Sequence, residues 1–184
     1  MSIRTQMETL LEKRQDGDED RRTLEADLQA AHNRAASMMA ATAGKKLVPY
    51  GASPGGWMAF ISMRTNVPRE GREPKFSSDY ENLNISVGSQ YSPKDGTYNV
   101  YFRVETFSVK NPEAASMWRT AAVAANKVGS AQLKAFGKVS KMTKTSNGIA
   151  VFGVDADAES ARRLVKALPG IATKVAKAVI KVVS

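Results

Sequence analysis

The sequence predicts an α+β fold: an antiparallel sheet of about five strands in two hairpins, packed with helices and preceded by an N-terminal helical hairpin or kinked helix. Two observations lead to this class. Two pairs of strand-like segments flank the turn sequences Ser92-Pro93-Lys94-Asp95-Gly96 and Asn147-Gly148. Segments with helical periodicity come before, between and after these pairs, which differs from the regular strand–helix alternation of a parallel sheet.

The first 43 residues have helical periodicity. Residues 2–15 predict a short helix, the acidic run 16–20 predicts an interruption, and residues 19–43 predict a second helix. The apolar stripe of the second helix is thin and rich in alanine, so the helix needs a partner to be stable. That partner is either the rest of the domain or another copy of the protein. We therefore predict that residues 1–43 form a packing or oligomerisation segment.

The remaining chain divides by composition. Residues 44–56 contain four glycines and two prolines and predict a linker, which leaves residues 57–184 as a basic α+β domain. Within that domain, Asn111-Pro112-Glu113 predicts a helix start, because asparagine caps a helix and proline fits its first position. The predicted elements are strands at 57–64, 83–91, 97–109, 138–145 and 149–154, a long basic loop at 65–82, and helices from 112 to about 136, at 155–168 and at 171–183.

Composition excludes several classes of protein. The 184 residues include no cysteine, which rules out a disulfide scaffold, a thiolate metal site and a cysteine nucleophile. The N-terminus is charged and lacks the apolar core of a signal peptide. Because no run approaches the roughly 18 apolar residues of a membrane span, we expect a soluble protein without a span, located in the cytoplasm or within a virus particle.

The net charge of +9 is distributed unevenly. Residues 1–43 carry 6 basic and 8 acidic side chains, residues 44–110 carry 9 and 6, and residues 111–184 carry 12 and 4. Nearly all of the excess positive charge therefore lies in the last 74 residues. This asymmetry indicates a polyanionic partner such as nucleic acid or a membrane surface, although a solvated lysine face is the simpler alternative.

Lysines form stripes on two predicted helices. At 100° per residue, lysines 127 and 134 fall opposite an apolar arc, and lysines 174, 177 and 181 form a second stripe beside the apolar arc of the last helix. No acid stands at i±3 or i±4 to neutralise them, so phosphate groups are suitable partners. The predicted nucleic-acid-binding residues are Lys127, Lys134, Lys138, Lys141, Lys174, Lys177, Lys181, Arg69, Arg72, Arg103 and Tyr101.

The strand at 97–109 has two different sides. Tyr98, Val100, Phe102 and Val104 predict a core side, whereas Tyr101, Arg103 and Phe107 belong to a mixed side. Tyr101 and Phe107 on that side could stack on bases. The alternative is that the N-terminal helices cover it as a second layer, and we favour this alternative because helices on both faces of a sheet would use these aromatic residues as core.

Candidates for metal or catalytic chemistry are weak. Asp155, Asp157 and Glu159 follow a strand, where acids can hold Mg²⁺, but they fit a helix start better. Asp16, Asp18 and Asp20 have the spacing of a calcium loop, but Arg21 occupies the position of its glycine. The single histidine, His32, cannot by itself build a triad or a zinc site.

The sequence therefore predicts a non-enzymatic nucleic-acid-binding protein without a cofactor or metal. The alternative is a structural subunit of a larger assembly, such as a virus particle, in which the N-terminal helices dock on neighbouring subunits. In both cases residues 1–43 are expected to provide a homo-oligomer or assembly contact.

Overall fold

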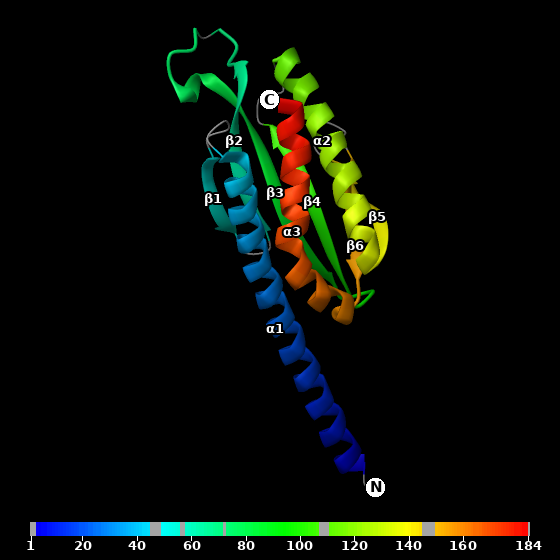
Figure 1. Cartoon of the computed structure of the whole chain (residues 1–184). Coiled ribbons are helices and arrows are strands. Elements are labelled where there is room, and N and C mark those ends of the chain that lie inside the picture. The colour runs from blue at the N-terminus through cyan, green and yellow to red at the C-terminus, as the bar shows by residue number, and fades with distance from the viewer. Residues whose placement is uncertain are drawn as a thin grey trace.

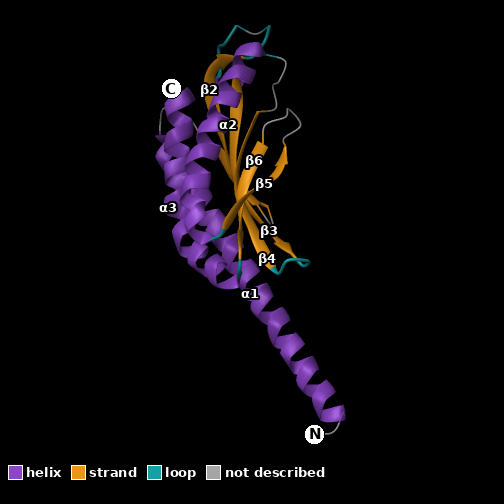
Figure 2. Cartoon of the chain, turned by 90° about the vertical axis from the view of Figure 1, so that its right-hand side faces the viewer, coloured by secondary structure: helices purple, strands orange, loops and turns teal. Residues whose placement is uncertain are grey.

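The computed structural model of the chain describes residues 3–44, 49–55, 58–71, 73–106, 111–144 and 150–183. It shows one antiparallel sheet with long helices on one of its faces (Figures 1 and 2). The elements are α1 (Ile3–Ala43), β1 (Pro49–Gly55), β2 (Met58–Pro68), η2 (Ser77–Asp79), β3 (Tyr80–Ser92), β4 (Thr97–Thr106), α2 (Pro112–Leu133), η3 (Lys134–Phe136), β5 (Lys138–Lys144), β6 (Ala150–Ala156) and α3 (Ala158–Val183). The predicted α+β class is confirmed.

The sheet has the strand order β1-β2-β3-β4-β6-β5, and every neighbouring pair is antiparallel. β3 and β4 form the first predicted hairpin, and β5 and β6 form the second. Helix α2 connects the two hairpins, and β6 then pairs with β4, where Val154 lies opposite Val100. This crossover makes one continuous sheet of the two hairpins.

The core lies between the sheet and the helical layer. Figure 2 shows α1, α2 and α3 on the same side of the sheet. α3 lies between α1 and α2 in Figure 1 and packs against both. The buried apolar residues include Leu28 of α1, Ile85 of β3 and Leu168 of α3. The indole Nε1 of Trp118 donates to the carbonyl of Val104 over 2.8 Å, so α2 is also tied to β4 by a buried hydrogen bond.

α1 is one continuous helix, without the predicted interruption at residues 16–20. The run contains no proline, and Arg21 pairs with Asp18 at 3.3 Å and with Glu25 at 3.7 Å along the helix. Ion pairs at these spacings stabilise a helix by a few tenths of a kcal/mol each, which offsets part of the cost of Gly17. The first part of α1 extends beyond the rest of the molecule (Figure 1).

The segment predicted as a linker contains a strand. β1 occupies residues 49–55 and raises the strand number from the predicted five to six. β1 is an edge strand with a single neighbour, β2. Proline removes a ladder hydrogen bond and is tolerated mainly at edges. The two prolines of β1, Pro49 and Pro54, therefore fit an edge, although their composition alone predicts a loop.

Several residues that predict a turn or a helix end in the sequence have that role in the structure. The first hairpin turns at Gly96, whose φ of 64° favours glycine. The side-chain oxygen of Asn111 accepts hydrogen bonds from the amides of Glu113 and Ala114 at the start of α2. Gly137 ends the helical segment where any Cβ would lie 2.2 Å from the carbonyl oxygen of Asp155. The turn at Asn147-Gly148 lies outside the described residues.

The two predicted C-terminal helices are one helix. α3 continues from Ala158 to Val183 and contains Pro169, although proline predicts a helix end. Proline removes one backbone hydrogen bond and costs about 3 kcal/mol in an exposed helix interior. Here two residues close to the proline, Leu168 and Ile171, are buried in the core. Tertiary packing against α1 and α2 therefore outweighs the local cost.

Candidate nucleic-acid interface

The exposed sides of α2, η3 and α3 together form a strongly basic surface, which we call the basic helix surface. It carries nine exposed cations and two exposed acids, Glu113 and Glu159. The cations are Arg119, Lys127, Lys134, Arg162, Arg163, Lys166, Lys174, Lys177 and Lys181. The predicted lysines 127, 134, 174, 177 and 181 are thus placed on one layer of the molecule.

Within the described part of the chain, few acids neutralise the basic helix surface. Of its nine cations, only Arg162 forms an ion pair with a described residue, Asp20 at 3.6 Å. Lys174 donates its Nζ to the amide oxygen of Gln132 over 2.6 Å, which brings the exposed sides of α3 and α2 together. Along α3, four like-charged pairs stand at i,i+3 or i,i+4 spacing, such as Lys177 with Lys181. Each such pair destabilises the helix slightly.

The apolar side of α3 is used within the fold. Ile171, Val175 and Val179 are buried, so this side is not free to lie on a membrane surface. Among the described residues, no helix is long and apolar enough to cross a membrane. The basic helix surface is therefore the side of α3 that remains for an external partner.

A second surface lies on the opposite side of the sheet, where no described helix packs (Figure 2). Strand register places Ser86 beside Phe60 and Arg103, and Asn84 beside Ser62 and Glu105. The alternate residues of the same strands point into the core under the helices. We call this the polar sheet face and define it by Ser62, Arg64, Asn84, Ser86, Tyr101, Arg103 and Glu105.

Tyr101 belongs to the polar sheet face, so the expectation that the N-terminal helices cover it is wrong. α1 packs on the other face of the sheet, because its apolar stripe meets the core side of the strands. Tyr101 is nevertheless only 8% exposed. Burial raises the pKa of its hydroxyl to about 12; nearby Arg103 acts against this shift and Glu105 acts with it. Phe107 lies outside the described residues.

The polar sheet face contains polar atoms without partners. Arg103 forms an ion pair with Glu105, and the guanidinium of Arg64 lies 4.8 Å from the centre of the Tyr80 ring. The Nε atoms of both arginines are nevertheless buried without a hydrogen bond, as is Oδ1 of Asn84, a residue that is 8% exposed. Buried polar atoms normally have partners, and each exception requires an explanation.

The other predicted binding residues lie apart from these groups. Lys138 and Lys141 are exposed on β5, the edge strand, where lysines protect a sheet against edge-to-edge pairing. Arg69 follows β2, and its Nε donates to the carbonyl of Tyr80 over 3.2 Å. Arg72 lies outside the described residues. The fold therefore divides the predicted set among the helical layer, the sheet edge and the polar sheet face.

The acids at the end of β6 and before α3 form hydrogen bonds within the fold. Asp155 accepts a hydrogen bond from the amide of Asn99, and Asp157 accepts one from the backbone N–H of Ser160 over 2.8 Å at the start of α3. The backbone N–H of Ser160 is the largest cause that lowers the pKa of Asp157; the Ser160 side chain and nearby Arg163 lower it further. Among the described residues, no group of three or more acids or histidines could hold a metal ion.

The predicted binding residues do not include all members of the basic helix surface and the polar sheet face. Arg119, Arg162, Arg163 and Lys166 belong to the basic helix surface, and the helical wheel that found the lysines also finds them. Arg64 and Asn84 could not be grouped with Arg103, because only the register of β2, β3 and β4 places them side by side.

No known protein family, curated protein or solved structure shows significant similarity to this chain. The two surfaces and their chemistry are therefore the basis for a functional proposal.

Proposed function

We propose that this protein binds nucleic acid without catalysing a reaction, and that the basic helix surface contacts the phosphates. The observation that carries the proposal is the imbalance of that surface, with nine exposed cations against two exposed acids. Eight of the nine cations form no ion pair with any described residue. The cytoplasm and the interior of a virus particle would both supply the polymer.

The energetics favour a polyanion on this surface. A purely solvated helix face usually mixes charges of both signs, because opposite pairs stabilise it. Here the like-charged pairs of α3 repel one another, and a phosphate backbone would remove this repulsion. Binding to phosphates also releases counterions, so affinity should fall with a log–log slope of about 0.7–0.9 for each contacted phosphate.

Fluorescence anisotropy with labelled single- and double-stranded oligonucleotides, at several salt concentrations, tests the proposal. We expect binding that weakens steeply with salt. Replacing Lys177 and Lys181 by glutamine should lower the slope by about 1.4–1.8. Replacing the exposed Lys75 and Lys94, which lie outside the helices, is the matched control and should leave it unchanged. No binding at low salt, or equal effects of the two pairs, would contradict the proposal.

A second candidate function is that of a structural subunit in a larger assembly. Two observations favour it: the first part of α1 extends beyond the body of the molecule (Figure 1), and the polar sheet face holds buried polar atoms without partners. An isolated helix segment of this length is marginally stable in water. A neighbouring subunit that packed on it would supply the missing contacts.

Light scattering during size-exclusion chromatography tests the second candidate. Removal of residues 1–43 would also remove Leu24 and Leu28 from the core, so the informative truncation ends at residue 16. We expect the full chain to form a concentration-dependent oligomer and the shortened chain to lose it while staying folded. A full chain that is monomeric at every concentration would argue against the assembly.

A further inference from the structure

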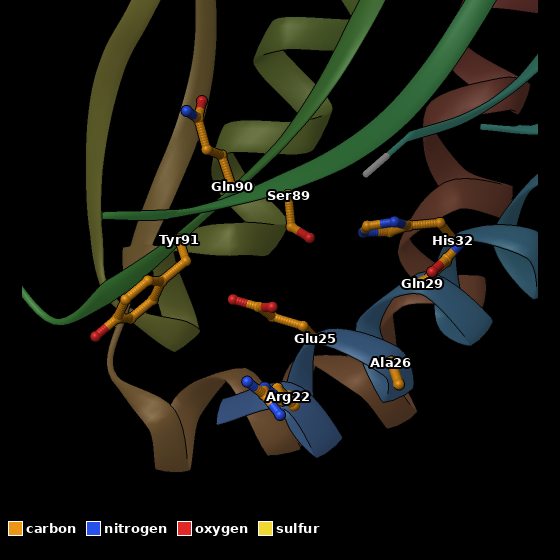
Figure 3. Close-up of a pocket in the computed structure, with 8 residues that line it drawn as sticks. All are labelled: Arg22, Glu25, Ala26, Gln29, His32, Ser89, Gln90 and Tyr91. Carbon is orange, nitrogen blue, oxygen red and sulfur yellow. The ribbon is translucent and has the colours of Figure 1, made fainter. Parts of the chain in front are cut away.

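A pocket of about 630 Å³ lies between α1 and the end of β3 (Figure 3). One wall comes from α1 and the other from the strand segment 89–91. In the described register Gly88 pairs with Met58 of β2, and residues 89–91 pair with β4. The lining residues are Arg22, Glu25, Ala26, Gln29, His32, Ser89, Gln90 and Tyr91.

His32 is the unusual member of this pocket. Its side chain is 1% exposed, and neither Nδ1 nor Nε2 has a hydrogen-bond partner. Figure 3 shows the imidazole directed into the hollow beneath Ser89. Burial lowers the pKa of His32 to about 4, so the ring is neutral at pH 7. A neutral imidazole has one N–H donor and one nitrogen acceptor, and both need a partner.

The lining restricts the chemistry of a ligand. The described lining exposes more apolar than polar surface, so an apolar ligand body fits, but an acyl chain would leave the polar groups of His32, Ser89 and Gln29 without partners. A simple anion would meet the carboxylate of Glu25, which points into the hollow in Figure 3. A simple cation would meet Arg22, while Arg21 already pairs with Glu25 at 3.7 Å. A neutral ligand with donors and acceptors side by side satisfies His32, Ser89 and Gln29 together.

We propose that this pocket binds a nucleobase, a neutral ring whose edge carries donors and acceptors, with His32 and Ser89 at its inner end. The proposal deepens the proposed function and rests on it, because nucleic acid would supply the base. The basic helix surface would hold phosphates elsewhere on the molecule, so the two sites can be tested separately.

His32 is the only histidine in the chain, so its ring gives one unambiguous NMR signal. Adenosine, guanosine, cytidine and uridine are added in separate titrations. We expect at least one of them to cause a saturable shift of that signal, and inorganic phosphate to cause no shift. Replacing Gln29 by alanine should lower the affinity for the nucleoside that binds by about five- to tenfold, which is the effect of one lost hydrogen bond. Asn33, an exposed amide of α1 outside the pocket, is the matched control.

Three results would overturn the pocket proposal. The first is an unchanged His32 signal with all four nucleosides, and the second is the same shift with phosphate alone. The third is equal binding by the Gln29→Ala and Asn33→Ala variants. Salt-dependent oligonucleotide binding that persists in any of these cases would leave the proposed function intact, whereas its loss would remove both.

Discussion

The basic helix surface and the polar sheet face differ in the side chains that they carry and in how exposed those side chains are. The basic helix surface carries long cations that are exposed to water and have few ion-pair partners among the described residues. The polar sheet face carries short amides and hydroxyls that are nearly enclosed by their neighbours, such as Asn84 and Ser86. The first surface suits a partner held by charge at a distance. The second suits a partner that comes close enough to form hydrogen bonds.

The largest change in unfolding free energy is expected from substitutions on the two faces of β4. Phe102 is 2% exposed and its ring lies against Gly129 of α2, whereas Arg103 follows it on the polar sheet face. Replacing Phe102 by alanine should cost about 3–5 kcal/mol of unfolding free energy through lost burial and a cavity. Replacing Arg103 should cost about 1 kcal/mol or less, because its ion pair is partly exposed. Urea unfolding measures both losses, and equal losses would contradict the proposed difference between the two faces of β4.

The stability of the protein should depend on pH, because His32 is buried on the side of the sheet that the helices cover. The pKa of His32 is about 4 in the folded protein, against an ordinary value of 6.5 for a solvated histidine in the unfolded chain. The unfolded chain therefore takes up a proton first as the pH falls, and stability should decrease between pH 6.5 and 4 by up to about 3 kcal/mol. Thermal or urea unfolding from pH 7 to 4 measures this loss. The His32→Leu variant should lose less stability over that range, and parallel curves for the two proteins would contradict the assignment.

Removing positive charge from the two surfaces should change the salt dependence of oligonucleotide binding by different amounts. Replacing Arg64 and Arg103 on the polar sheet face by glutamine should leave the salt slope of oligonucleotide binding within about 0.5 of the wild-type value, since neither contacts a phosphate in the proposed mode. Replacing Lys177 and Lys181 should lower that slope. The same titrations measure both pairs. A larger drop for the arginine pair would move the phosphate site to the sheet.

The smallest change in unfolding free energy should come from Asn84, whose amide oxygen has no partner among the described residues. Its Oδ1 is buried without a partner, so valine, which favours strands, should raise the unfolding free energy of the isolated chain by about 0.5–1 kcal/mol. If the polar sheet face binds a partner, the same variant should weaken that contact. Urea unfolding and light scattering measure the two effects, and a destabilised Asn84→Val monomer would show that the amide is satisfied within the chain.

Local signals in the sequence were accurate where local physics decides the structure. Asn111 caps α2, and the turn at Gly96 follows the predicted hairpin. They failed where packing overrides propensity. Pro169 does not end α3 because Leu168 and Ile171 beside it are packed in the core, and Pro49 and Pro54 lie in a strand because that strand is an edge.

The candidate sites show the same division. The lysine stripes could be found from the sequence, since the helical period fixes which residues share a side. The polar sheet face could not, because residues from β2, β3 and β4 meet only through register. The pocket at His32 also required the structure, since His32 and Ser89 are more than 50 residues apart in the chain.

The sequence by itself determined the α+β class, the two hairpins, the cap of α2 and the concentration of positive charge in the last 74 residues. Each of these depends on interactions within a few residues or on composition alone. Only the tertiary structure decided that all three helices share one face of the sheet, so that Tyr101 faces away from them and His32 of α1 is buried near the end of β3. Which face of a sheet receives its helices depends on how distant apolar surfaces fit together, and no local pattern records that choice.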